Sequence, residues 1–80
     1  MTEKKAIREV MYEKRVTQTE LATKAGFKSQ SNIAGLLNNN KNGIRIDNLI
    51  RVFDAMGCDI VIRDRENPDK EWIIDSTDAS

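Results

Sequence analysis

Histidine is absent from this 80-residue chain, and cysteine and proline occur only once each. The single cysteine, Cys58, has no second cysteine in the chain with which to form a disulfide. Without histidine, the chain also lacks the side chain that most often binds metals and most often acts as a general base. We therefore expect no catalytic residues, no metal site and no cofactor, and we predict that the protein is not an enzyme.

Long apolar runs are also absent. No uninterrupted apolar run exceeds three residues, whereas a helix that crosses a bilayer needs about 20. The first eight residues mix charged and apolar side chains, with no apolar stretch longer than the pair Ala6 and Ile7, and so lack the continuous apolar segment of an export signal. We expect no membrane partner and a cytoplasmic location, and a chain of 80 residues can build one compact domain at most.

Charge is divided unevenly along the chain, although its net charge is zero. Residues 1–52 carry ten Lys or Arg against five Asp or Glu, which leaves +5, and residues 53–80 carry three against eight, which leaves −5. A basic end that faces a polyanion and an acidic end kept away from it would explain this division. In so short a chain, chance is the alternative explanation.

Two amphipathic helices are predicted at the two ends of a helical region. The first spans residues 2–15 or 3–15, and the last spans residues 45–56 or 46–56, before Gly57. In both, apolar residues recur at spacings of three and four, which places them on one side of a helix. For the first helix these residues are Ala6, Ile7, Val10 and Met11, and for the last they are Ile46, Leu49, Ile50, Phe53 and Met56.

Two shorter helices joined by a glycine-containing turn are predicted between them. Thr17 can cap the first of these, and Glu20, three residues on, can reach back to complete a capping box. Gly26 is expected to end that helix in the left-handed conformation. Ser29 can cap the next helix, which we expect to run to about Asn38 before a polar, asparagine-rich loop.

Two short strands are predicted after the helices, over residues 58–63 and 71–75, because both segments are rich in β-branched residues. The hairpin they form is apolar on both faces, with Ile60, Ile62, Trp72 and Ile74 on one face and Val61 and Ile73 on the other. A lone hairpin is marginal in water. We expect one face to lie on the helices and the other face, or a free edge, to be covered by a second copy of the chain. Ile60, Ile62, Trp72 and Ile74 are the predicted dimer interface.

The chain thus divides into three predicted parts: residues 1–57 form a helical domain, residues 58–75 a hairpin extension of it that dimerises, and residues 76–80 a frayed tail. The segments that carry a family resemblance all lie in the first part. They are TQTELATKAG at residues 17–26, QSNI at residues 30–33 and IDNLIRVFDAMG at residues 46–57.

From about Ile7 to Gly57 the sequence resembles the Cro/C1-type (XRE-like) repressors of bacteria and phages. The resemblance implies a mainly α fold, a four-helix lambda-repressor-like helix-turn-helix domain, followed here by the two-stranded β-hairpin. It also implies a sequence-specific transcriptional regulator, a repressor that binds an inverted-repeat operator in double-stranded DNA as a homodimer.

The resemblance further implies which residues contact DNA. Residues that match base-contacting positions are Gln30, Ser31, Ala34, Gly35 and Asn38, and residues assigned to phosphate contacts are Thr17, Gln18, Lys28, Ser29, Lys41 and Arg45. Two departures from the family pattern bear on this assignment. Many relatives have a long polar side chain where this chain has Gly35. A glycine there either allows a close approach to the DNA groove or means that this position contacts no base. Compared with the commonest family spacing, this chain has one extra residue between Gly26 and Ile33. The match of residues 28–30 to the family positions can therefore shift by one.

Helix geometry supports the same outward face independently of the resemblance. Because Ile33, Leu36 and Leu37 must face the core, Gln30, Ser31, Ala34 and Asn38 are left to point outward. Plainer roles are the alternatives: Gln18, Lys28, Lys41 and Arg45 as solvated surface, and Ser29, Ser31 and Asn32 as helix caps.

Two other functions remain open from the sequence. One is the antitoxin of a toxin–antitoxin operon, with a toxin protein as a further partner, because some antitoxins follow this helical domain with a dimerising strand. The other is a protein-interaction module that kept the helical fold without binding DNA, for which the zero net charge and the uncharged third helix are arguments.

Overall fold

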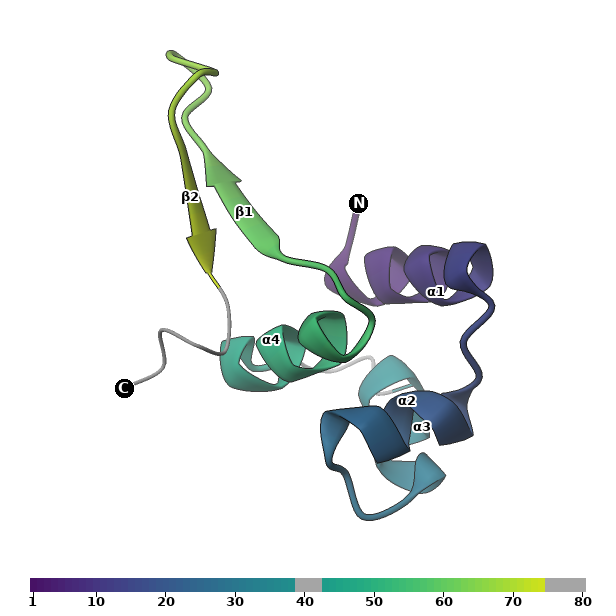
Figure 1. Ribbon diagram of the computed structural model, residues 1–80. Coiled ribbons are helices and arrows are strands. Elements are labelled where there is room, and N and C mark those ends of the chain that lie inside the picture. Colours follow the sequence, from purple (N-terminus) through teal and green to yellow (C-terminus); the bar gives the residue numbers. More distant parts are fainter. Residues whose placement is uncertain (39–42, 75–80) are drawn as a thin grey trace.

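The computed structural model describes residues 1–38 and 43–74. Four helices precede a two-stranded antiparallel hairpin, which confirms the predicted fold class and element order (Figure 1). The elements are α1 (Glu3–Lys14), α2 (Gln18–Ala25), α3 (Gln30–Asn38), α4 (Ile46–Ala55), β1 (Ile60–Arg63) and β2 (Glu71–Ile74). Across the described ranges, every helix is too short or too polar to span a membrane.

The ends of α1 and α2 follow local rules that the sequence displays. The Thr2 hydroxyl accepts a hydrogen bond from the Lys5 N–H at 3.2 Å, and Thr17 and Glu20 form the predicted capping box, with Glu20 N–H to Thr17 Oγ1 at 3.1 Å. Gly26 ends α2 in the left-handed region at φ 80°. At the corresponding position after α1, Arg15 has φ 56°, a conformation that costs an L-residue energy.

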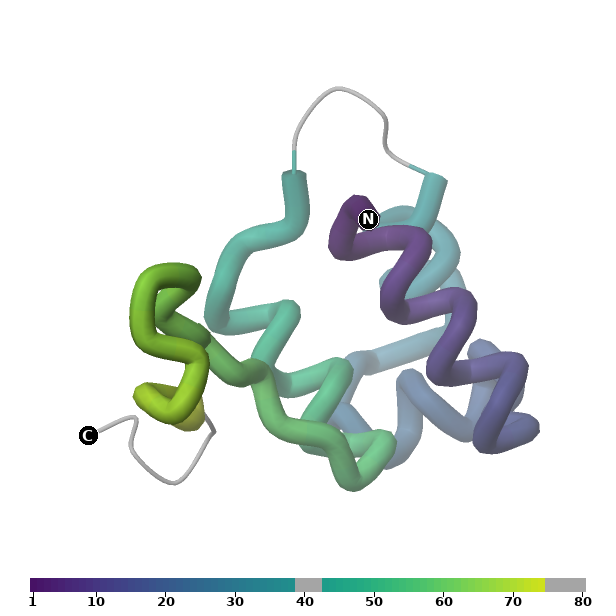
Figure 2. The backbone as a smooth tube through the Cα atoms, turned by 90° about the horizontal axis from the view of Figure 1, so that it is seen from above, coloured from purple at the N-terminus to yellow at the C-terminus, as the bar shows by residue number. Residues whose placement is uncertain are grey.

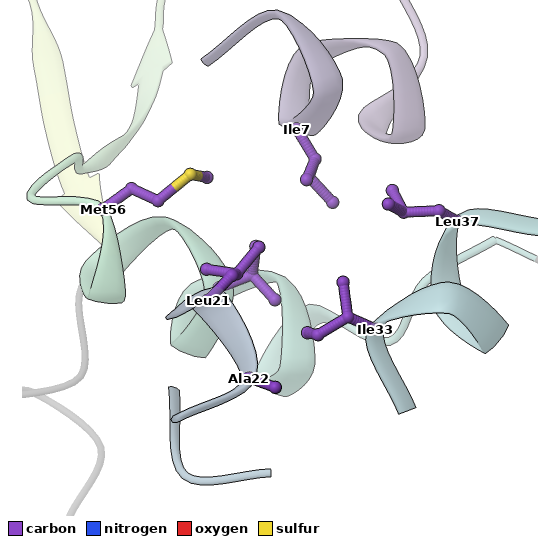
Figure 3. Packing of buried hydrophobic residues seen from close by; sticks show 7 residues of the cluster. Ile7, Leu21, Ala22, Ile33, Leu37 and Met56 are labelled. Atoms are coloured by element: carbon purple, nitrogen blue, oxygen red, sulfur yellow. The ribbon is translucent and has the colours of Figure 1, made fainter. Parts of the chain in front are cut away.

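The core draws on all four helices (Figure 3). Its buried side chains are Ile7, Leu21, Ala22, Ile33, Leu37, Val52 and Met56. A polar contact joins the ends of α1 and α4, because Lys14 Nζ donates to the Met56 carbonyl at 2.7 Å. Helix α2 packs against α3 on one side and α4 on another, and α4 also contacts α1, so the four helices form one bundle.

The buried side of α4 differs from the prediction at three positions: Ile50, predicted to face inward, does not pack against the core, and Ile46 and Val52 also differ. Ile46 was expected to face inward but is 55% exposed, and Val52, which was not expected there, is 1% exposed. The buried stripe is Leu49, Val52, Phe53 and Met56. The apolar surface of α4 is wider than one helix face, and packing against α2 selects the side centred on Val52, so Ile46 lies to one flank.

The hairpin has the predicted alternation of faces. Ile60 pairs with Ile74 and Ile62 with Trp72 on one face, and Val61 pairs with Ile73 on the other. Strand β1 begins at Ile60, two residues later than predicted, because Cys58 still packs against the helical core. Asp75 and the predicted tail at 76–80 lie outside the described residues.

The expectation that one hairpin face lies on the helices is wrong. The two strands make their extensive contacts with each other, and the hairpin projects from the bundle beside α4 (Figures 1 and 2). Val61, Ile62, Trp72 and Ile73 are 47–54% exposed and come from both faces. Gly57 follows α4 in the left-handed region at φ 72°, Cys58 after it still packs against the core, and the strands then project from the bundle (Figure 1).

Candidate nucleic-acid interface

The first residues of α2 and α3 meet on one surface of the bundle. Gln30 Nε2 donates to Gln18 Oε1 at 3.4 Å, and the Thr19 hydroxyl donates to Gln30 Oε1 at 3.5 Å. Gln30 and Thr19 are exposed and Gln18 is half-buried. These long hydrogen bonds are weak, so the Gln30 amide is oriented by the protein but stays available to another partner.

The predicted outward face of α3 is found where expected. Ile33 and Leu37 are buried, whereas Gln30, Ser31, Gly35 and Asn38 are exposed and Ala34 is half-buried. A Cβ added at Gly35 would meet no atom within 4 Å. The glycine is therefore not required by any contact inside the described protein.

Hydroxyl groups at the start of α3 are linked to one another. The hydroxyls of Ser29 and Ser31 lie 2.6 Å apart, and the Ser29 hydroxyl donates to Asn32 Oδ1 at 3.3 Å. The backbone carbonyl of Ser29 accepts from the Asn32 N–H at 3.1 Å, as a residue preceding a helix does. Ser29 thus holds the first turn of α3 together, and Ser31 shares that network.

A groove of about 540 Å³ runs between α3 and the start of α4. It brings Gly35, from the outward face of α3, together with Arg45, whose side chain is 80% exposed. Among the described residues, those that line it are Phe27, Asn32, Gly35, Leu36, Gly43, Ile44, Arg45 and Asn48. Arg45 Nε contacts Asp47 Oδ1 at 3.3 Å, and such an exposed ion pair is worth little. Arg45 can therefore exchange this partner for a phosphate at small cost.

The other residues expected at phosphates are placed differently. The Thr17 hydroxyl is used in the capping box, where it also donates to Glu20 Oε1 at 3.1 Å, and Lys28 is exposed in the turn before α3. Lys41 lies outside the described residues. The structure brings Gln18 and Gln30 together and puts Arg45 on the groove beside α3.

The sequence pattern gave no indication of Arg8, which supports the end of α3. Its Nη2 donates to the Leu37 carbonyl at 3.1 Å and to Asn38 Oδ1 at 3.4 Å. A cation at a helix C-terminus complements the helix dipole. Asn38, expected to contact bases, is therefore also bound from α1, and the partners are too far apart in the chain for any local pattern to pair them.

Glu3 ties the start of α1 to the segment before α4. Hydrogen bonds from its own backbone N–H and from that of Ile44, the latter at 3.3 Å, hold the pKa of the Glu3 carboxyl below its ordinary value of 4.5. Ile44 and Arg45 precede α4, so this contact helps to fix the side of the groove opposite α3.

Comparison with protein families gives one match to this architecture. The model of the Cro/C1-type HTH DNA-binding domain matches residues 6–61, more than half of the chain. Comparison with curated proteins and with solved structures gave no match.

Proposed function

The chain belongs to the family of Cro/C1-type helix-turn-helix DNA-binding domains, and from this we propose that it is a sequence-specific transcriptional repressor that binds an inverted-repeat operator as a homodimer. The family membership confirms the resemblance seen in residues 7–57 and gives DNA as a partner. Operator recognition, repression and the homodimer are the further steps of the proposal.

The contact between Gln18 and Gln30 carries the proposal. A glutamine amide can pair bidentately with the N6 and N7 positions of adenine in the major groove. Gln18, in the first turn of α2, can hold a backbone phosphate with help from the helix N-terminus. Since Gln18 Oε1 accepts from Gln30 Nε2, one residue that positions the protein also orients the residue that reads the base.

Affinity and discrimination are assigned to different residues. Helix α3 contains no charged residue, so its Gln30, Ser31 and neighbouring outward positions can discriminate bases without strong attraction to phosphates. The cations Lys28 and Arg45 lie before and after α3 and are exposed. We assign phosphate contacts to them, with Lys41 a third candidate outside the described residues.

The homodimer is proposed on the hairpin. The face formed by Ile60, Ile62, Trp72 and Ile74 is wholly apolar, whereas the opposite face joins Val61 and Ile73 to the charged pair Arg63 and Glu71. A second copy that covers the first face would remove exposed apolar surface from water. The hairpin lies on the other side of α4 from α2 and α3 (Figure 1), so dimerisation there leaves the proposed DNA contacts free.

Selection of bound sequences from a random duplex library tests the function. We expect enrichment of a motif with two-fold symmetry whose half-sites are separated by about one helical turn or a multiple of it. A library without enrichment would contradict sequence-specific binding, and an enriched motif without symmetry would contradict the dimer.

The exposed hairpin favours a second candidate, a protein-interaction module without DNA contacts whose apolar strands bind another protein. An antitoxin would bind DNA as well as a toxin protein, so it is a variant of the first proposal. Binding to mixed-sequence DNA separates the two readings. A DNA-binding protein loses affinity steeply as salt rises because phosphate contacts release counterions. A protein-interaction module without DNA contacts would show little binding at low salt and therefore no such slope.

A further inference from the structure

Arg51 connects α4 to the end of α2 and is not part of the proposed DNA surface. Its Nη2 and Nε both donate to the Ala25 carbonyl, at 3.0 and 3.2 Å. Ala25 is the last residue of α2, where carbonyl groups lack partners within the helix. The guanidinium thus satisfies a carbonyl immediately before the turn to α3, at the negative end of the α2 dipole.

The same guanidinium makes one further contact with the turn, at Phe27, and one with Asn48 on its own helix. It stacks over the Phe27 ring, with Cζ 4.2 Å from the ring centroid, and Nη1 lies 3.5 Å from Asn48 Oδ1. Gly26 lies between Ala25 and Phe27 and has φ 80°. A Cβ added at Gly26 would lie 3.5 Å from Arg51 Nη2. Arg51 therefore contacts Ala25 and Phe27, the residues on either side of Gly26.

We infer that Arg51 is a positioning residue that fixes the turn between α2 and α3 and so sets the placement of Gln30 against the bases. The inference rests on the proposed function. Phe27 packs against the core on one side and is covered by the guanidinium on another, and Gln30 follows it by three residues. A turn free to change its backbone angles would let the first turn of α3 shift relative to Gln18.

Lysine cannot replace arginine in this role. It keeps the positive charge, but its ammonium group lacks the planar fork that binds one carbonyl through two N–H groups while stacking on a ring. Arg51→Lys therefore removes the clamp while preserving attraction to phosphates. Arg51→Ala removes both, and Lys24→Ala, on α2, removes one charge near the turn without touching the clamp.

The experiment measures affinity of the full chain for its selected operator and for a mixed-sequence duplex at several salt concentrations. We expect Arg51→Lys to lose about tenfold in operator affinity, within the range of one good base contact, with mixed-sequence affinity and salt slope unchanged. Lys24→Ala should retain the wild-type ratio of the two affinities. Amide hydrogen exchange at Gly26 and Phe27 should be faster in both Arg51 variants.

Several results would overturn the inference. One is an Arg51→Lys variant with the wild-type ratio of operator affinity to mixed-sequence affinity. Another is a salt slope that falls by about one in Arg51→Ala and returns to the wild-type value in Arg51→Lys, because Arg51 would then contact a phosphate. Loss of helical circular dichroism in Arg51→Lys would show a general structural role. If the wild type selects no operator, the proposed function fails, but unchanged amide exchange in Arg51→Lys would still refute the clamp.

Discussion

Single side chains in this protein perform separable tasks, and Gln30 is the one to which we assign base recognition. It is exposed at the start of α3, and its amide is oriented by Gln18 and Thr19. Arg8 and Arg51 bind the two ends of the segment that carries that surface, at Leu37 and Asn38 and at Ala25. In our proposal Gln30 contacts bases, Lys28 and Arg45 contact phosphates, and Arg51 positions the turn, so these roles can be removed one at a time.

Replacing Gln30 by alanine should cost about 1 to 3 kcal/mol of operator binding and relax the preference at one base pair in each half-site. Binding-site selection repeated with the variant measures both. Lys28→Ala is the matched control, and it should weaken binding to operator and unrelated duplexes equally while lowering the salt slope by about one. An unchanged motif bound at unchanged strength by Gln30→Ala would assign base reading elsewhere, to Ser29 or Ser31 if the register differs by one.

Arg15 offers a test of stability away from the DNA surface. It holds the left-handed conformation at the end of α1 with φ 56°, which costs an L-residue about 1 to 2 kcal/mol, partly offset by the entropy that glycine loses on folding. Arg15→Gly should therefore stabilise the protein by roughly 0.5 to 1 kcal/mol, measured by urea unfolding. Glu13→Gly, inside the same helix, should destabilise it by about 1 kcal/mol; equal signs for the two changes would refute the argument.

Protonation of Glu3 should weaken the link between α1 and the segment before α4. Because its folded pKa is lowered, the carboxylate contributes stability above its unfolded pKa, and that contribution is lost as the pH falls through the folded value. Thermal unfolding of wild type and Glu3→Gln should therefore differ at neutral pH and converge in acid. Glu9→Gln removes a carboxylate from the same helix as a control; a wild-type advantage over Glu3→Gln that grows toward low pH would contradict the sign.

At the level of elements, local chemistry predicted more than long-range packing. The capping box at Thr17, the left-handed Gly26 and the paired faces of the hairpin follow from neighbouring residues and were predicted correctly. The rotation of α4, which buries Val52 and exposes Ile46, depends on how other helices pack against it. No local pattern could predict that rotation.

In the candidate site too, local features could be predicted from the sequence and long-range contacts could not. The outward face of α3 follows from helical periodicity, so its exposed residues could be predicted from the sequence. The contacts from Arg8 to Leu37 and from Arg51 to Ala25 join residues 29 and 26 positions apart. Such pairs become visible only when the helices are placed in space, as does the separation of the hairpin from the bundle.

Helix α3 contains a glycine that its own packing does not need. Since a Cβ at Gly35 meets nothing within 4 Å, Gly35→Ala should stabilise the protein by up to about 1 kcal/mol through helix propensity. Thermal unfolding measures this, with Ala34→Gly expected to destabilise by a comparable amount. A Gly35→Ala variant that is not more stable would contradict the open space beside Gly35. The operator affinity of Gly35→Ala then tests the role of this position. A lower affinity would show that the backbone at Gly35 approaches the DNA groove closely, and an unchanged affinity would show that the position contacts no base.

For the whole molecule, the central prediction is a dimer formed through the hairpin. Changing Ile62 to Asn together with Trp72 to Gln should give a monomer or an unfolded chain, because both residues lie on the wholly apolar face. Val61→Thr with Ile73→Thr alters the opposite face and should leave the dimer intact. Analytical ultracentrifugation at roughly tens of micromolar, where obligate dimers are assembled, measures this, and a wild-type monomer there would refute the prediction.

The position of the hairpin, on the far side of α4 from α2 and α3 (Figure 1), gives the molecule an electric dipole moment. Among the described residues, the bundle (1–38 and 43–57) carries nine Lys or Arg against six Asp or Glu, which leaves +3, and the hairpin (60–74) carries three against four, which leaves −1. The field near a DNA duplex exerts a torque on this dipole, which turns the basic end toward the phosphates, and because the field is non-uniform it also attracts the aligned molecule. Screening confines this torque to within about 10 Å of the duplex at 0.1 M salt, so the protein is aligned during its last approach, before any side chain touches a base.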